Sequence, residues 1–233
     1  FLRCLFLVVA INSIGLIYIC FFILFFVIIS YVYVRVKRYF ILDKYKQKVI
    51  EKWRKSIMAI IKPFVAIRPD TDVADRVAAL PYDVYNRAEA AEEVRREPLS
   101  FLKIDRAETQ FDDSVDTYAP QVYDKAKEIF ESMVADGIYV TDDDECYYIY
   151  RLTMDGREQT GIVACASVDD YVNNVIKKHE NTREEKEQDR IRHVDTLSAQ
   201  TGPIFLAYRS KKAINDVVSK VMTEESPLYD FTA

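Results

Sequence analysis

The chain has 233 residues, which is enough for one large domain or two small ones, and its formal net charge is −5 at pH 7. The charge is uneven: residues 1–57 hold ten Lys and Arg against two acids, whereas residues 58–233 hold 22 bases against 35 acids, a formal charge of −13. Nucleic acids are bound mainly through clustered Lys and Arg, so this composition excludes nucleic acid as an expected partner.

Residues 4–34 are almost wholly apolar, with Asn12 and Ser13 as the notable interruptions. About 20 such residues are enough for a helix to span a bilayer. Nine bases follow within residues 35–55, and this positive segment would leave the remainder of the chain in the cytoplasm. The pattern therefore predicts an apolar N-terminal helix followed by a basic linker.

A second interpretation is that residues 1–57 arise from spurious upstream translation, and we favour it. The chain begins at Phe1 without a methionine, and a new start is available at Met58. On either interpretation, residues 58–233 form a cytoplasmic domain. An inner-membrane anchor is expected only if residues 4–34 are genuinely translated.

The first elements of this domain are short. Residues 58–67 alternate loosely and are rich in Ile, Val and Phe, which indicates a strand interrupted at Lys62 and Pro63. A short helix is expected over residues 72–80, because Pro81 stops it.

A capping pattern marks the next helix. Asn86 is followed three residues later by Glu89, so a helix should run through the Ala/Glu-rich segment to about Arg96. Residues 100–105 are then predicted to form a short strand.

The clearest helix begins at Pro120, a residue that suits the first helical position, and Gly137 lies just past its end. Its apolar residues recur at helical spacing and are Val122, Ala126, Ile129, Phe130 and Met133.

The dipeptide Asp155-Gly156 predicts a β-hairpin, because a primed two-residue turn needs positive φ at both central positions. Its strands would cover residues 146–154 and 158–168. This conformational role alone explains most of the segment.

Further helix starts follow the hairpin. Ser167 with Asp170 should open a helix toward Ile176, and Thr182 with Glu185 forms a capping-box pattern at the start of a very polar helix. The remaining elements are, in order, the end of that helix before Gly202-Pro203, a strand over 204–209, a helix over 211–222 and an irregular terminus at 228–233.

Strands and helices alternate without internal repeats, so the fold class is α/β, a mixed α+β domain. The chain contains no Gly-rich phosphate loop, no dinucleotide fingerprint and no nucleophile elbow, and its four cysteines lack the spacing of a zinc motif. Any phosphate site must therefore use side chains and helix ends.

Both histidines lie in one fifteen-residue stretch that is rich in charge. At about 100° per residue, one stripe of the polar helix would carry Arg183, Lys186, Asp189, Arg190 and His193, with His179 and Glu180 just before the cap. Phosphoryl transfer requires such a set, with cations for phosphate oxygens and a carboxylate for a hydroxyl proton. The other interpretation is a solvated face with ion pairs, which is the more frequent case.

A second candidate site lies in the proline-fixed turn after Pro81, where Tyr82 and Asp83 combine a phenol with a carboxylate. Loops between helices often contact substrates. A loop that simply ends a helix is an equally good interpretation.

Six segments carry a resemblance to a known family: MAIIKPF at 58–64, ALPYDV at 79–84, SFLKID at 100–105, YIYRLTMDGREQTGIVACASVDDY at 148–171, KKHENTREEKEQDRIRHVD at 177–195 and TGPIFLAYR at 201–209. They resemble the bacterial family catalogued as domain of unknown function 1015. Members typically begin at the methionine matching Met58 and are longer at the C-terminal end. The resemblance implies that residues 58–233 are a fragment, the N-terminal part of a ParB/sulfiredoxin-like catalytic domain.

That fold includes kinases of free L-serine, so the resemblance implies a phosphotransferase that acts on a small molecule, with ATP, ADP or pyrophosphate and Mg²⁺ left open as donor and metal. The roles carried over are catalytic for Asp189, Glu180 and His193, phosphate-binding for His179, Arg183, Lys186 and Arg190, and substrate-binding for Asp83 and Tyr82, with no metal ligand among them. Asn181 stands where the family pattern has Leu, outside the polar set. The alternative is a noncatalytic ligand-binding or regulatory module, and the oligomeric state stays open.

Overall fold

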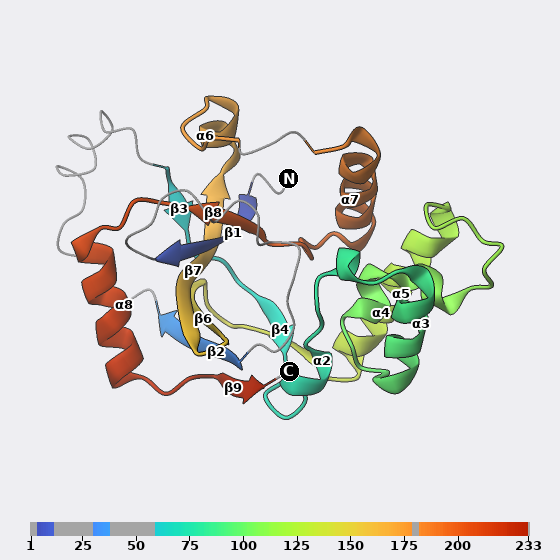
Figure 1. Cartoon of the computed structure of the whole chain (residues 1–233), viewed down its shortest axis with the longest axis horizontal. Coiled ribbons are helices and arrows are strands. Elements are labelled where there is room, and N and C mark those ends of the chain that lie inside the picture. Colours follow the sequence, from blue (N-terminus) through green and yellow to red (C-terminus); the bar gives the residue numbers. More distant parts are fainter. Residues whose placement is uncertain (1–3, 12–29, 38–58, 179–181, 233) are drawn as a thin grey trace.

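The computed structural model describes residues 4–11, 30–37, 59–178 and 182–232 (Figure 1). The strands are β1 (Cys4–Ile11), β2 (Ser30–Lys37), β3 (Ile61–Lys62), β4 (Ile67–Pro69), β5 (Tyr139–Thr141), β6 (Cys146–Met154), β7 (Arg157–Ser167), β8 (Ile204–Ala207) and β9 (Tyr229–Thr232). The helices are α2 (Ala74–Val77), α3 (Arg87–Arg96), α4 (Leu102–Asp105), α5 (Pro120–Ala135), α6 (Val168–Val172), α7 (Glu184–Leu197) and α8 (Lys212–Glu224), with short 3-10 helices η3 (Tyr82–Val84) and η4 (Ala107–Gln110).

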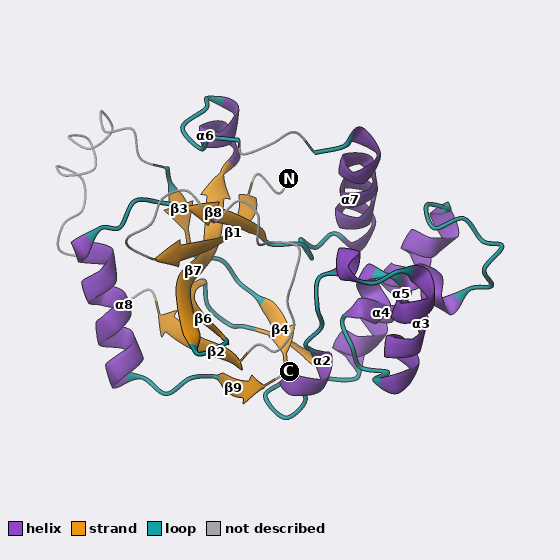
Figure 2. Ribbon diagram, viewed as in Figure 1, coloured by secondary structure: helices purple, strands orange, loops and turns teal. Residues whose placement is uncertain are grey.

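The mixed α/β class is confirmed, because one sheet carries helices on two sides (Figure 2). Its strand order is β8-β1-β7-β6-β2-β9, β3 also pairs with β7, and β4 and β5 form a separate two-stranded sheet. The pairs are antiparallel except for β1 with β8. Figure 1 shows α8 on one side of the sheet, while α3, α4, α5 and α7 gather on the other.

The predicted hairpin is confirmed. Asp155 and Gly156 have φ of 52° and 73°, as a primed turn requires. β6 and β7 pair from Met154 opposite Arg157 to Tyr148 opposite Val163. Local turn chemistry therefore fixes the register of the two central strands.

Beyond that ladder, the chain around β3 pairs with the ends of β6 and β7. Lys62 of β3 pairs with Cys165, and Phe64 bridges to Cys146 through two backbone hydrogen bonds of 2.9 and 3.1 Å. The strand expected over residues 58–67 is thus present in part, and it is broken near Pro63 as predicted. Its role is to extend the sheet where the hairpin strands separate.

Three of the predicted helix starts are confirmed, two by side-chain caps and one by its proline. The Asn86 side chain accepts from the Glu89 amide and the Glu89 carboxylate accepts from the Asn86 amide, which completes the capping box of α3. Pro120 opens α5, and Gly137 follows its end with φ of 74°. The Ser167 side chain likewise caps α6.

The predicted start of α7 is wrong. Its N-cap is Arg183, which makes no side-chain capping bond, and the helix begins at Glu184 rather than after a Thr182 cap. The pattern of Thr182 and Glu185 is present in the sequence, but a capping box also needs the extended backbone to fall at the Thr position.

Residues 100–105 form a helical turn, α4, instead of the predicted strand. The Ser100 side chain accepts from the Leu102 amide, and the Phe101 amide donates to the Val77 carbonyl. Leu102 and Ile104 are both buried. A short apolar run does not distinguish a strand from a buried helical turn by its periodicity.

The C-terminal residues were also predicted wrongly, because they form β9 on the edge of the sheet, where Tyr229 lies opposite Tyr33 of β2. The apolar helix expected over residues 4–34 is not confirmed: β1 and β2 are strands, and residues 12–29 lie outside the described residues. In the part of the chain that the structure describes, no helix is long and apolar enough to cross a membrane.

The largest described core lies between the helices α4, α5 and α7. It is built from Val77, Ile104, Ala107, Val122, Ala126, Ile129, Met133, Tyr139 and Leu197. Because α7 contributes only Leu197 to this apolar set, the rest of its inner face must be filled by polar side chains.

The turn at Gly156 gives the first testable prediction. A Cβ at Gly156 would meet no atom within 4 Å, so the positive φ is its only obstacle. Gly156→Ala should lower the free energy of unfolding by about 1–2 kcal/mol in urea denaturation. Gly202→Ala is the matched control, because Gly202 has equal space without positive φ and should lose nothing. Equal losses would contradict a primed turn.

Candidate functional site

The inner face of α7 is polar. Asp189, His193 and Leu197 follow one another at intervals of four residues, and they are 7%, 3% and 5% exposed. Helix α7 packs against α5, so two of these three inward positions place ionisable groups in the interior. The interpretation of the stripe as a solvated face is therefore wrong for Asp189 and His193.

Arg190 is the centre of the site. Its Nε and Nη2 donate to Asp189 Oδ2 at 3.1 and 2.9 Å, and its Nη1 donates to Asp105 Oδ1 at 3.3 Å. The guanidinium carbon lies 4.4 Å from the centre of the Tyr82 ring. Burial alone lowers the pKa of Arg190, but the two carboxylates outweigh it and raise this pKa. We call the set Tyr82, Asp105, Tyr123, Asp189, Arg190 and His193 the Arg190 cluster.

Asp189 is fully engaged by its neighbours. The Tyr123 hydroxyl of α5 donates to Oδ1 at 2.9 Å, while Arg190 occupies Oδ2. Burial raises the pKa of Tyr123 to about 12, and the hydrogen bond to Asp189 adds to the shift. Asp189 therefore fixes the orientation of Arg190 against α5.

Asp105 has a different environment at the end of α4. Burial raises the pKa of its carboxyl to about 6, and the nearby Arg190 opposes this shift. Its side chain is 13% exposed. Its negative charge also raises the pKa of Tyr139, although burial is the larger cause. The Tyr139 hydroxyl is buried and has no hydrogen-bond partner among the described residues.

His193 connects α7 to two other segments. Its Nε2 lies 3.2 Å from the Ile104 carbonyl oxygen and its Nδ1 lies 3.1 Å from the Thr201 hydroxyl. Burial lowers the pKa of His193, and the charge of Arg190 lowers it further. A neutral ring fits both contacts, because Nε2 donates to the carbonyl and Nδ1 accepts from the hydroxyl. Both ring nitrogens are thus used within the protein.

The other predicted site residues lie at different distances from this centre. Lys186 donates to the Tyr118 hydroxyl at 3.0 Å and is close enough to Tyr82 and Asp189 for their charges to act on it. Arg183 is exposed at the N-cap of α7. Asp83 is exposed and makes no hydrogen bond or ion pair with the described residues. His179 and Glu180 lie outside the described residues.

Sequence reasoning missed two members of the Arg190 cluster and one neighbour of Asp105. Asp105 was assigned to a strand, Tyr123 lies among the apolar residues of α5, and Tyr139 lies in the short strand β5. A hydroxyl on the apolar face of a helix is the one signal that was available for Tyr123, because a buried Tyr usually needs a partner for its OH.

The backbone of the turn that carries Tyr82 is held in place by the half-buried Arg106. Arg106 donates to the carbonyls of Tyr82 and Tyr85 at 2.9 and 2.7 Å, and its Nε donates to Glu108 at 2.6 Å. Glu108 is 2% exposed, so this ion pair lies within the helical layer. The turn that carries Tyr82 is therefore attached to the same end of α4 as Asp105.

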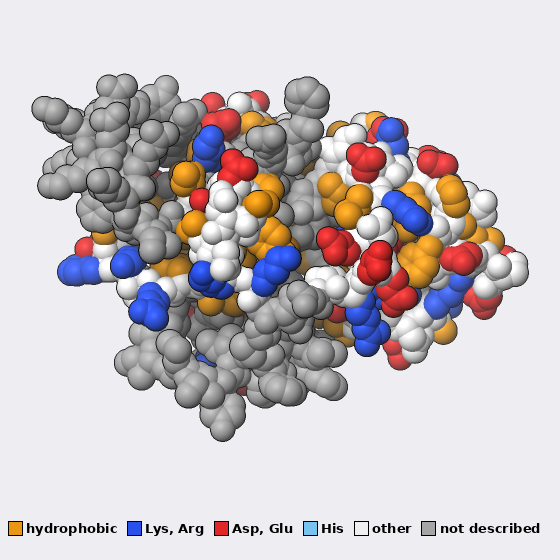
Figure 3. All heavy atoms as spheres, turned by 90° about the horizontal axis from the view of Figure 1, so that it is seen from above, with side chains coloured by type: hydrophobic (Ala, Val, Ile, Leu, Met, Phe, Trp, Pro, Cys, Tyr) orange, Lys and Arg blue, Asp and Glu red, His pale blue; other side chains and the backbone are white. Residues whose placement is uncertain are grey.

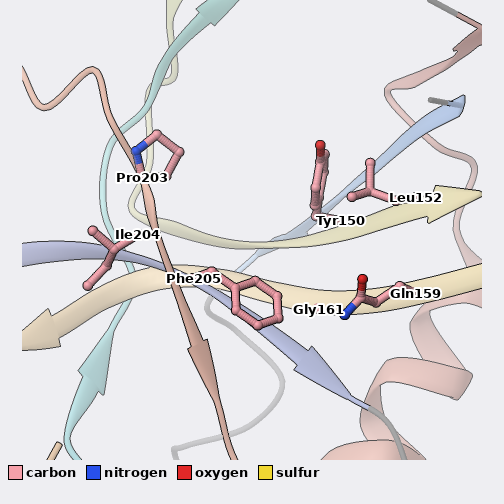
Figure 4. Close-up of a pocket in the computed structure, with 7 residues that line it drawn as sticks. All are labelled: Tyr150, Leu152, Gln159, Gly161, Pro203, Ile204 and Phe205. Atoms are coloured by element: carbon pink, nitrogen blue, oxygen red, sulfur yellow. The ribbon is translucent and has the colours of Figure 1, made fainter. Parts of the chain in front are cut away.

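An apolar pocket of about 180 Å³ lies away from these residues, on the sheet (Figure 4). It is lined by Tyr150, Leu152, Gln159, Gly161, Pro203, Ile204 and Phe205. Within residues 59–178 and 182–232, no three His, Cys, Asp or Glu side chains form a group that could hold a metal ion.

The bond between Tyr123 and Asp189 can be tested by stability. Tyr123→Phe leaves Asp189 Oδ1 buried without its donor, so the free energy of unfolding should fall by about 1–2 kcal/mol. Tyr139→Phe is the matched control, because its hydroxyl bonds to no described group and its loss should cost nothing. Urea denaturation of both variants measures the difference, and an equal change in both would contradict the arrangement.

The raised pKa of Asp105 predicts a pH dependence of stability. An unfolded Asp titrates near 3.9, whereas the folded group titrates at about 6, so the native state binds more protons between these values. Its contribution to stability is therefore lost as pH rises from about 4 to about 6. Compared with the unaltered chain, Asp105→Asn should gain about 1–3 kcal/mol between pH 4 and pH 7. A constant difference in urea denaturation at the two pH values would contradict this shift.

Comparison with known proteins identifies the family. Residues 61–233 match the family model described as protein of unknown function (DUF1015), and this range contains the whole Arg190 cluster. The comparisons with curated proteins and with solved structures gave no match. Since the matched residues make up well over half of the chain, it belongs to the DUF1015 family of proteins of unknown function.

Proposed function

We propose that the chain is a small-molecule phosphotransferase that transfers a phosphoryl group to the hydroxyl of free L-serine at the Arg190 cluster. The observation that supports this most is the guanidinium of Arg190, which is fixed in place and partly exposed. It lies beside Asp105, whose second carboxylate oxygen accepts no hydrogen bond from the described residues. Arg190 is 27% exposed and is held by Asp105, Asp189 and the Tyr82 ring. Catalysis of phosphoryl transfer consists mainly of positioning and electrostatic stabilisation, which such a group provides.

The two cations of the site keep donors for an anion. A guanidinium has five N–H donors, and the two carboxylates use three of those of Arg190. An ammonium has three donors, and Lys186 uses one of them on Tyr118. The remaining donors lie on the same side of α7, where they can bind the oxygens of a phosphate.

The charge of the surrounding surface supports a small anion as the ligand. On the right half of the face shown in Figure 3, where the helices α3, α5 and α7 lie, the Lys and Arg side chains of the described residues are scattered among Asp and Glu. A polyanion needs several phosphate contacts in a row, whereas two adjacent cations suffice for one phosphate group.

The proposal that serine is the phosphoryl acceptor rests on the sequence. Tyr82 lies in the Arg190 cluster and the next residue is the exposed Asp83. Its carboxylate is therefore available beside the cluster to bind the ammonium group of serine. The relationship to ParB/sulfiredoxin-like free-serine kinases stays a prediction. So do the roles of His179 and Glu180.

One observation favours the second candidate, a noncatalytic ligand-binding or regulatory module. Both oxygens of Asp189 and both ring nitrogens of His193 are occupied by groups of the protein. Two of the three groups predicted to be catalytic thus stabilise the fold. A binding module requires the cations of this site but no proton acceptor.

A donor screen tests the proposal. The 233-residue chain is incubated with L-serine, Mg²⁺ and either ATP, ADP or pyrophosphate, and phosphoserine is measured by mass spectrometry. We expect transfer with at least one donor. Arg190→Lys should reduce the rate by about 100-fold, because a single ammonium cannot bond two carboxylates and a phosphate in the geometry of a guanidinium.

The matched control is Arg95→Lys, which makes the same replacement at an exposed ion pair of α3 and should leave the rate unchanged. Donor binding by calorimetry without any phosphoserine would replace the enzyme with the binding module. A chain that neither binds a donor nor forms phosphoserine contradicts both candidates.

A further inference from the structure

We infer that Asp105, a residue with no role predicted from the sequence, accepts the proton of the substrate hydroxyl in this site. The inference rests on the proposed phosphotransferase and assigns one step of it. Within the Arg190 cluster as the structure describes it, the two carboxylates are Asp189 and Asp105, so the choice made here is between these two.

The number of hydrogen bonds separates these two groups. Asp189 accepts three of them, one from Tyr123 on Oδ1 and two from Arg190 on Oδ2. Asp105 accepts one, from Arg190 on Oδ1 at the longer distance of 3.3 Å, and its Oδ2 accepts none from the described residues. Each hydrogen bond to an ionised carboxylate makes it a poorer base, so Asp105 is the better proton acceptor.

The position of Asp105 places this oxygen where a substrate can meet it. Arg190 donates to Asp105 Oδ1 and is also the proposed phosphate ligand, so an acceptor hydroxyl bound beside that phosphate would be adjacent to the guanidinium that Asp105 contacts. The Tyr139 hydroxyl, on which the charge of Asp105 acts, is buried in a residue that is 5% exposed and has no partner among the described residues. Although it is near enough for the charge of Asp105 to act on it, it therefore makes no hydrogen bond to this carboxylate.

The groups around Asp105 also leave its carboxylate ionised at pH 7, as a proton acceptor must be. The titratable and charged groups that face it are Arg106, Tyr139, Asp189, Arg190 and His193. Burial raises its pKa to about 6, so the group is ionised at pH 7 and still basic enough to take a proton. A general base works best when its pKa lies near the working pH.

The step balances without any further reactant. The serine hydroxyl gives its proton to Asp105 Oδ2, and its oxygen forms a bond to the terminal phosphorus of a nucleoside polyphosphate or pyrophosphate. The bond from that phosphorus to the bridging oxygen breaks, and the leaving phosphate keeps the electron pair. Asp105 then releases its proton to water.

The experiment is a pH profile of phosphoserine formation between about pH 4.5 and 8.5 for the unaltered chain, Asp105→Asn and Asp189→Asn. The kcat of the unaltered chain should fall about tenfold per pH unit below about 6. Asp105→Asn should lower kcat at about pH 7.5 by about 100-fold or more with little change in KM, and it should abolish this acidic limb. Asp189→Asn should keep the limb, because Asp189 orients Arg190 and does not take the proton.

Two further variants make the result specific. Asp105→Glu restores a carboxylate and should recover part of kcat together with an acidic limb, which a purely structural role would not produce. Asp143→Asn, an exposed residue between β5 and β6, should match the unaltered chain. Circular dichroism of each variant confirms that the fold is kept.

The outcomes test the role of Asp105 separately from the proposed phosphotransferase function. A donor phosphate also titrates near pH 6, so the limb is assigned to Asp105 only by its loss in Asp105→Asn. If the unaltered chain is active and Asp105→Asn keeps its kcat and its limb, Asp105 is not the base. If the unaltered chain forms no phosphoserine with any donor, the proposed phosphotransferase function is wrong. The assignment of Asp105 as the proton acceptor is then wrong as well.

Discussion

The contact on which the helical part of the molecule depends is the guanidinium of Arg190 between Asp189 and Asp105. It joins α7 to α4, and through Tyr123 it joins both to α5. Three ionisable groups enter a mostly buried space together, which is tolerable only because each charge meets an opposite one. Loss of Arg190 would leave two carboxylates without their cation, so the three helices are coupled through one side chain.

Such a cluster is a costly way to attach a helix. A buried ion pair often adds less stability than apolar side chains of the same volume, because the charges must leave water. In the core beside it, α4 and α5 pack through apolar side chains such as Ile104, Ile129 and Met133. Stability alone is therefore a weak explanation for the charged residues on this face of α7.

The sequence predicted those parts of the fold that are decided by neighbouring residues. Asp155-Gly156 specifies its own turn, Asn86 and Glu89 cap α3 within four residues, and Pro120 opens α5. The misses depend on distant partners. Tyr229 becomes a strand residue because β2 lies beside it, and the residues of α4 become helical because the Phe101 amide finds the Val77 carbonyl.

The residues of the site fall into the same two groups, those predicted from local spacing and those that depend on distant partners. The spacing of Asp189, Arg190 and His193 is enough to predict that they share one stripe of a helix, because helical periodicity is a local property. The residues that give these three their roles come from other elements. Tyr123 occupies one oxygen of Asp189, and Ile104 and Thr201 occupy the two nitrogens of His193.

Sequence spacing therefore identifies which groups meet, whereas only their partners show which group is engaged by the fold and which is left to react. By that criterion, Asp189 and His193 hold the helix, because every polar atom of their side chains is used within the protein. Asp105 keeps one carboxylate oxygen and Arg190 keeps two N–H donors that no described residue uses, so these two groups are the ones we propose to contact the ligand.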